Sequence, residues 1–179
     1  MGILAVDFAW FDWQEVLYRD TELADVIGLF GEPGDRMVHL QDAALFVILC
    51  NWLADLRMTY PRAQIVMPLS LGSHRDHRLL FQASLDVLDR DQLLFFEDFP
   101  YATYQAEELT ELVQLYHLTP IEVDISQYLE QRIWVAECYQ SQLPALYHST
   151  SHFVDLIREY TSSLGGQQRF VERYWEITR

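Results

Sequence analysis

The sequence contains no lysine. All 12 basic residues are arginine, and 27 acidic residues leave the 179-residue chain with a formal charge of −15. The absence of any side-chain primary amine excludes Schiff-base chemistry, a lysine-anchored cofactor and a P-loop lysine. The shortage of cations also argues against a nucleic-acid partner, because affinity for nucleic acid comes mainly from neutralising phosphates. The same charge balance predicts repulsion from anionic membranes.

Cysteine is scarce as well. Cys50 and Cys138 lie far apart without CxxC spacing, so we expect two buried thiols rather than a disulfide framework or a cysteine metal site. The longest apolar run, residues 43–50, is much shorter than the ~20 residues that a membrane-spanning helix needs. The N-terminus lacks the basic region of a signal peptide. These absences together predict a cytoplasmic, soluble protein with no membrane partner.

The composition that is present is typical of a folded domain. Half of the residues are hydrophobic and only 22% are charged, which distinguishes the chain from a disordered acidic tail. The length suits one compact domain, and neither an internal repeat nor a linker divides the sequence. We therefore treat residues 1–179 as a single domain.

Strand-like and helix-like segments alternate along the chain. We expect strands at residues 3–8, 64–69, 93–96 and 121–124, and helices at residues 42–58, 73–88, 106–116, 126–142, 151–161 and 167–177. This alternation predicts an α/β fold, a Rossmann-like layered domain with a mostly parallel sheet. Four short strands are few for such a domain, so we expect that its first strands are missing. An open sheet edge would then favour a homo-oligomer.

The segment at residues 65–78 (IVMPLSLGSHRDHR) holds the most suggestive chemistry. It reads as a strand, a glycine-containing turn, Ser73 as N-cap and the first turn of a helix. His74 and His77 are three residues apart and so share a helix face, and neutral imidazole is a common zinc ligand. Asp76 is placed to orient an imidazole. A zinc site needs three or four ligands, so on spacing alone a solvated helix start is the alternative.

Residues 68–77 (PLSLGSHRDH), followed by residues 94–102 (LFFEDFPYA), resemble the LmbE/PIG-L family of zinc-dependent N-deacetylases. Residues 6–19, 125–142 and 172–175 are similar to further segments of that family, in the same order. The resemblance implies that His77 binds zinc and that His74, with Asp76 beside it, acts in catalysis by stabilising or protonating the oxyanion. The implied reaction is removal of acetyl from an N-acetylated sugar or sugar conjugate by a zinc-bound water.

Four residues are the expected substrate-binding groups: Asp12, Arg19, Asp98 and Tyr101. Asp98 follows a strand together with Glu97, where a carboxylate pair can bind sugar hydroxyls or cap a proline-fixed turn. For Asp12 and Arg19 the alternative is a surface salt bridge, and for Tyr101 it is packing in the core.

One element of the resembling family does not occur in this sequence. Its N-terminal HPDDE-type motif supplies a His and an Asp to zinc and a second Asp as general base, and no such motif is found. Three explanations stay open: a shortened chain, a second chain that supplies the motif, or loss of catalysis. The sequence thus leaves three functional hypotheses. They are a zinc-dependent deacetylase, a non-catalytic relative that binds carbohydrate or another protein, and a plain α/β interaction domain in which the two histidines are coincidental.

Overall fold

The structure is a computed structural model that describes residues 9, 11–16, 37–140, 143, 147, 149–166 and 168–178. The strand expected at residues 3–8 and the substrate-binding candidate Arg19 lie outside these residues. Within the described part of the chain, no helix has the length and apolar character that crossing a membrane requires.

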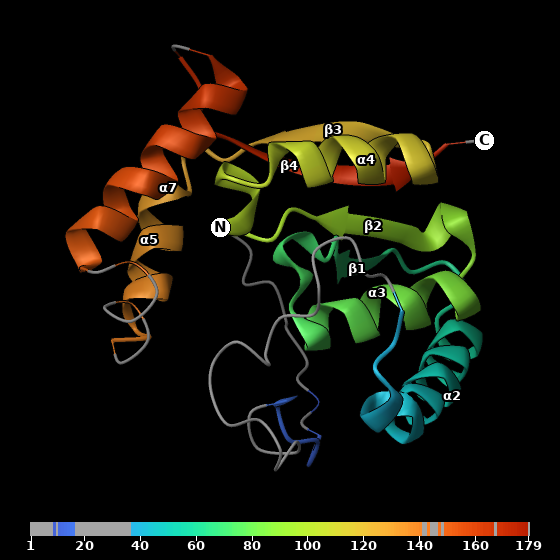
Figure 1. The fold of residues 1–179 in the computed structure, drawn as a ribbon. Helices are drawn as coiled ribbons and strands as arrows, with labels where there is room; N and C mark the ends of the chain where they lie inside the picture. Colours follow the sequence, from blue (N-terminus) through green and yellow to red (C-terminus); the bar gives the residue numbers. More distant parts are fainter. Residues whose placement is uncertain are drawn as a thin grey trace.

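The described residues form one four-stranded sheet with helices packed against it (Figure 1). In chain order the main elements are α2 (Ala43–Thr59), β1 (Ile65–Pro68), α3 (Arg75–Val87), β2 (Leu93–Phe96), α4 (Ala106–Tyr116), β3 (Leu118–Asp124), α5 (Leu129–Glu137), α7 (Thr150–Gly165) and β4 (Val171–Ile177). Helices α3 and α4 lie on the same side of the sheet, α2 packs on α3, and α5 and α7 lie together beyond one end of the sheet.

The strand order is β1-β2-β4-β3. β1 and β2 are parallel, whereas β4 runs antiparallel to both β2 and β3. The predicted layered α/β fold is therefore confirmed, but the sheet is mixed rather than mostly parallel. The cause is β4, which inserts between the parallel pair and β3 and reverses the strand direction.

The prediction of a helix over residues 167–177 is wrong. Val171–Ile177 is strand β4, and all seven of its residues pair with β3. Val171 and Trp175 are buried at spacing i, i+4, which fits one face of a helix as well as one face of a strand. Local periodicity cannot separate these two possibilities in a short segment, and the long-range pairing with β3 decides between them.

Other differences from the sequence-based expectations are smaller. The helix expected over residues 126–142 corresponds to α5, which is described only over Leu129–Glu137, and the strand expected at residues 121–124 begins earlier, at Leu118. Both cysteines are free thiols, but Cys138 is exposed and Cys50 only half-buried, so neither is the fully buried thiol that we expected.

Two hydrophobic clusters stabilise the fold. The larger lies between the sheet and helices α2, α3 and α4, and its fully buried members include Leu53, Leu69 and Phe95. The smaller joins α5 to α7 through Ile133 and Ile157. The functional candidates lie where β1 and β2 end.

Candidate functional site

The loop from β1 to α3 has an unusual backbone. Ser70, Gly72 and Ser73 have φ angles of 66°, 77° and 59°, all in the left-handed region. At Gly72 the space is also restricted, because a Cβ atom there would lie 2.5 Å from ring carbons of Tyr101. Non-glycine residues in this region cost free energy, so surrounding groups must hold the loop in place.

Two buried or partly buried carboxylates hold this loop. Asp98 Oδ2 accepts a hydrogen bond from the Leu71 N–H at 3.0 Å, and Glu108 Oε2 accepts one from the Gly72 N–H at 2.9 Å. The Ser73 hydroxyl donates to the other oxygen of Glu108 at 3.4 Å. Glu108 comes from the first turn of α4, and sequence reasoning missed it because no motif spacing links it to the histidines.

His74 is the N-cap of α3, a position that we had assigned to Ser73. Its Nδ1 accepts a hydrogen bond from the Asp76 N–H at 3.2 Å. A neutral imidazole that accepts at Nδ1 carries its proton on Nε2. That Nε2 lies 3.7 Å from Oε1 of Glu15, a second carboxylate that sequence reasoning had not singled out. His74 therefore presents an N–H donor at Nε2.

The structure brings the two histidines together, with ring centroids 4.9 Å apart. His77 Nδ1 lies 2.6 Å from Asp98 Oδ1; the imidazole is 34% exposed, whereas the carboxylate is completely buried. Within the described part of the chain, both atoms are buried and neither makes a hydrogen bond of normal geometry, so their close contact is an ion-pair contact. The contact leaves Nε2 as the atom of His77 that remains for a ligand.

Asp76, a predicted catalytic residue, contacts the N-terminal segment. Its Oδ2 accepts a hydrogen bond from the Val16 N–H at 3.0 Å, and this bond fixes Glu15 and Val16 against the start of α3. Asp12 belongs to the same segment and is exposed, and no contact in the described structure joins it to either histidine. The structure thus places Asp76 at the site and leaves Asp12 on the surface nearby.

Tyr101 lies behind the loop, half-buried against Gly72. Burial raises the pKa of its phenol, and the neighbouring Tyr104 and Asp98 raise it further. The neutral, protonated form of Tyr101 is therefore favoured beside the Asp98 carboxylate.

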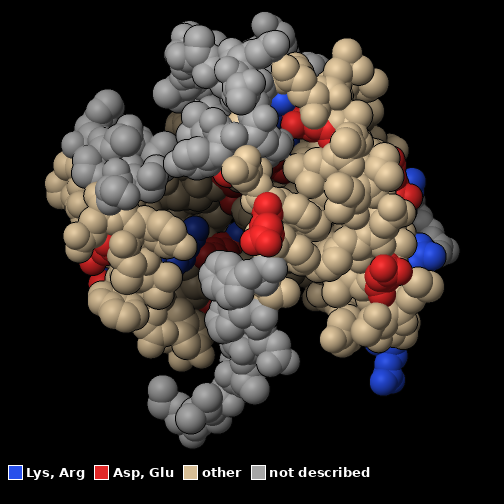
Figure 2. All heavy atoms as spheres, turned by 90° about the horizontal axis from the view of Figure 1, so that it is seen from below, with Lys and Arg blue, Asp and Glu red and all other residues tan. Residues whose placement is uncertain are grey.

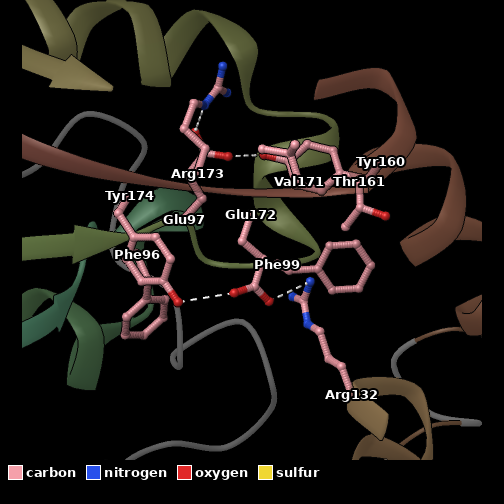
Figure 3. Close-up of a pocket in the computed structure, with 10 residues that line it drawn as sticks. All are labelled: Phe96, Glu97, Phe99, Arg132, Tyr160, Thr161, Val171, Glu172, Arg173 and Tyr174. Carbon is pink, nitrogen blue, oxygen red and sulfur yellow. Dashed lines mark hydrogen bonds and ion pairs between the residues drawn. The ribbon is translucent and has the colours of Figure 1, made fainter. Parts of the chain in front are cut away.

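Glu97 and Asp98 are consecutive, but their side chains contact different parts of the structure. Asp98 contacts His77 and the loop, whereas Glu97 accepts hydrogen bonds from Tyr160, Arg173 and Trp175 on the other side of the end of β2. Figure 3 shows the Glu97 carboxylate between Arg173 and Tyr160 in a pocket that does not include the histidines. Only Asp98 of the pair belongs to the histidine site.

Several arginines of this acidic protein lie beside carboxylates. Among the described residues, ion pairs with carboxylates are seen for Arg57, Arg75, Arg132, Arg158, Arg169 and Arg173. The Arg75–Asp42 pair is buried, at 3.2 Å, and anchors the start of α3 to the segment before α2. On the face shown in Figure 2, charged side chains are scattered among uncharged ones, and some lie inside a central hollow.

The side chains at this site supply one candidate metal ligand, His77, and not a complete metal site. A carboxylate against one nitrogen of an imidazole is the usual support for a metal bound to the other nitrogen, as in the Asp98–His77 contact. Among the described residues, however, no group of three or more His, Cys, Asp or Glu side chains is placed to hold a metal ion. Zinc needs three or four ligands, so these residues alone do not complete the predicted site.

Comparison with known proteins gives a fold but no family. No protein-family model matches the sequence, and no curated protein matches it. The structure is similar to the zinc-inhibited form of teicoplanin deacetylase Orf2, with a TM-score of 0.63 and 17% identity over 77% of this chain and 53% of that one. It is also similar to the A40926 pseudoaglycone deacetylase Dbv21, with a TM-score of 0.59 and 17% identity over 77% of this chain and 58% of that one.

This chain spans little more than half the length of either solved protein. At 17% identity the likeness establishes a shared fold, which is the fold that the sequence resemblance implied. Membership of the LmbE/PIG-L family, the zinc cofactor and the roles of individual residues stay predictions.

Proposed function

We propose that the chain works as a deacetylase-type hydrolase that removes acetyl from an N-acetylated sugar or sugar conjugate, with His77 as one ligand of a divalent metal, zinc by resemblance. The observation that carries the proposal is the 2.6 Å contact between His77 and the buried Asp98, in a fold shared with two deacetylases.

The role of Asp98 in this proposal is to orient His77. Its carboxylate favours a proton on His77 Nδ1, which leaves the Nε2 lone pair directed away from Asp98 and able to bind a cation. Asp98 is fixed in turn by the Leu71 N–H, so the histidine and the strained loop share one support. This arrangement orients an imidazole before any ligand binds.

His74 is the proposed group for the oxyanion. Because its Nδ1 accepts from the backbone, its Nε2–H is available as a donor to negative charge that develops on the amide oxygen. Glu15 Oε1 lies 3.7 Å from this nitrogen. Asp76 is proposed to assist by holding the segment that contains Glu15.

When bound, a divalent metal supplies a water of lowered pKa as nucleophile. The described residues provide only part of the ligand set for this ion. The second candidate function is a non-catalytic relative that binds carbohydrate. The polar, aromatic pocket beside Glu97 favours this candidate, because it is a built cavity that the hydrolase proposal does not use.

Metal retention and amine release test the proposal. The purified chain is loaded with zinc, dialysed and analysed for metal, and it is then incubated with N-acetylglucosamine while free amine is measured. About one equivalent of retained zinc, abolished by His77→Ala but not by His117→Ala, supports the hydrolase. His117 is a suitable control because it terminates α4, away from the site. Zinc retention that His77→Ala leaves unchanged contradicts the proposal.

A further inference from the structure

A second pocket lies on the other side of the end of β2 from His77. It has a volume of about 140 Å³ and opens between the end of β2, strand β4 and helices α5 and α7 (Figure 3). Its aromatic and charged lining includes Phe96, Phe99, Arg132, Glu172 and Tyr174. The volume is below the several hundred Å³ of a drug-sized site and suits a single small ring.

The inner wall of this pocket is rigid. Buried Glu97 accepts hydrogen bonds from Trp175 Nε1 at 2.8 Å, from Arg173 Nε and from the Tyr160 hydroxyl. The Arg173 guanidinium also lies 4.9 Å from the centroid of the Trp175 ring. Three donors satisfy this carboxylate, so Glu97 fixes the wall rather than binding a ligand itself.

The outer wall is accessible. Arg132 of α5 and Glu172 of β4 form an ion pair at 2.8 Å, and their side chains are 31% and 25% exposed. The Tyr174 hydroxyl donates to the second oxygen of Glu172 at 3.0 Å, and the Arg132 guanidinium lies 5.8 Å from the centroid of the Phe99 ring. In Figure 3 these four side chains lie together, with Phe96 beside Tyr174. Charged groups and aromatic rings thus face the same small space.

The charges of the pocket select against ionic ligands. Two arginines and two glutamates balance, and each arginine already has a carboxylate partner. A charged ligand would have to break one of these pairs and leave its partner partly desolvated, which is costly. A neutral ligand with several hydroxyl groups can instead donate to Glu172 and accept from Arg132 while the pair stays intact. The aromatic rings can pack against the apolar face of such a ligand.

We propose that this pocket binds one neutral sugar ring through the Arg132–Glu172 pair and the neighbouring aromatic rings. Binding requires no metal. That the ring belongs to the same glycoconjugate whose amide reaches His77 rests on the proposed function. In that case the pocket recognises a sugar unit other than the one that reacts.

Titration of the metal-free 179-residue chain tests this proposal. Calorimetry in a chelating buffer compares methyl glucopyranoside and N-acetylglucosamine with glucuronate. We expect both neutral sugars to bind more tightly than glucuronate.

Arg132→Gln should weaken binding of the neutral sugars at least about tenfold, because it removes a charged hydrogen-bonding group. Arg158→Gln is the matched control, since Arg158 forms an exposed ion pair with Glu130 outside the pocket lining. Circular dichroism and urea midpoints confirm that both variants fold.

Three results would overturn the proposal: no binding of either neutral sugar, tighter binding of glucuronate, or equal affinity in Arg132→Gln and Arg158→Gln. The His77→Ala variant separates this proposal from the hydrolase. Sugar affinity that survives in His77→Ala while zinc retention is lost places the sugar in the pocket, whether or not the chain is an enzyme. Sugar affinity that His77→Ala abolishes would assign the ligand to the histidine site and contradict the pocket proposal.

Discussion

Asp98 uses its two oxygens for two different purposes: Oδ1 lies 2.6 Å from His77 Nδ1, and Oδ2 accepts the Leu71 N–H at 3.0 Å. A single buried side chain therefore connects the metal-ligand candidate to the left-handed loop that leads into its helix.

Asp98→Asn should weaken zinc binding about 10- to 100-fold, because an amide orients the His77 ring less well than a carboxylate does. The amide oxygen can still accept from Leu71, and its NH₂ group would then face Nδ1 and favour the opposite tautomer. Zinc competition with a chromophoric chelator measures the affinity, and ¹⁵N spectra report the tautomer. Glu108→Gln is the control, because Glu108 supports the loop without contacting His77. Equal losses in the two variants would show that Asp98 acts only through the loop.

Gly72→Ala should destabilise the fold for two reasons. The left-handed backbone costs about 1 to 2 kcal/mol for a residue with a Cβ atom, and that atom would also collide with the Tyr101 ring. In a Tyr101→Ala background the collision with the ring carbons disappears and only the 3.0 Å approach to the Cβ atom of residue 101 stays, so Gly72→Ala should cost less there. Urea unfolding of the four proteins in this double-mutant cycle gives the difference. An identical cost of Gly72→Ala in both backgrounds would contradict the close approach of Tyr101.

Asp42→Asn should cost about 3 to 5 kcal/mol of unfolding free energy, because it removes the buried carboxylate that pairs with the buried Arg75 guanidinium. The matched change is Glu130→Gln, which breaks an exposed pair with Arg158 at 2.6 Å. Its expected cost stays within about 1 kcal/mol. Chemical denaturation compares the two variants, and similar costs would mean that burial does not distinguish the pairs.

The free energy of unfolding should fall as pH rises from 10 to 12, partly because of Tyr147. Burial, with smaller effects of Tyr104 and Tyr101, raises the pKa of its phenol from 10.0 to about 12. Between these values the unfolded chain loses the phenol proton and the folded chain keeps it, so rising pH favours unfolding. Below pH 10 both states are protonated and this stabilisation is complete.

Tyr147→Phe removes the ionisable group and should make the alkaline loss of stability shallower. Denaturation midpoints at pH 9 and pH 11 measure the difference (about one pH unit on either side of the ordinary tyrosine pKa). Tyr139→Phe, at an exposed position, controls for loss of a hydroxyl. If the Tyr147→Phe and Tyr139→Phe variants lose equal stability between pH 9 and pH 11, groups other than Tyr147 cause the alkaline loss of stability.

Local sequence patterns were sufficient for much of the fold. Residues 93–96 and 106–116 match β2 and α4 as predicted, because an apolar strand run and an amphipathic helix are each specified within a few residues. Strand β4 was missed because its conformation depends on pairing with β3, about fifty residues earlier in the chain. The mixed strand directions of the sheet depend on the same long-range pairing, so local sequence patterns could not predict them either.

At the site, the HxDH spacing predicted that His74 and His77 lie close together, and they do. The supporting carboxylates were harder to find. Asp98 was recognised through the FEDFPYA resemblance but assigned to substrate, and its position beside His77 depends on the parallel register of β1 and β2. Glu15 and Glu108 reach the site from the N-terminal segment and from α4, and a single sequence carries no signal for such contacts.

The adjacency of Glu97 and Asp98 has a consequence for the evolution of this protein. The two carboxylates contact different parts of the structure, so an insertion or deletion of one residue before Glu97 would move both of them away from their partners. Both the histidine support and the rigid pocket wall would then be lost in one mutational event. The length of the segment leading out of β2 should therefore be strictly maintained in descendants that keep either feature, even where the identities of its residues drift.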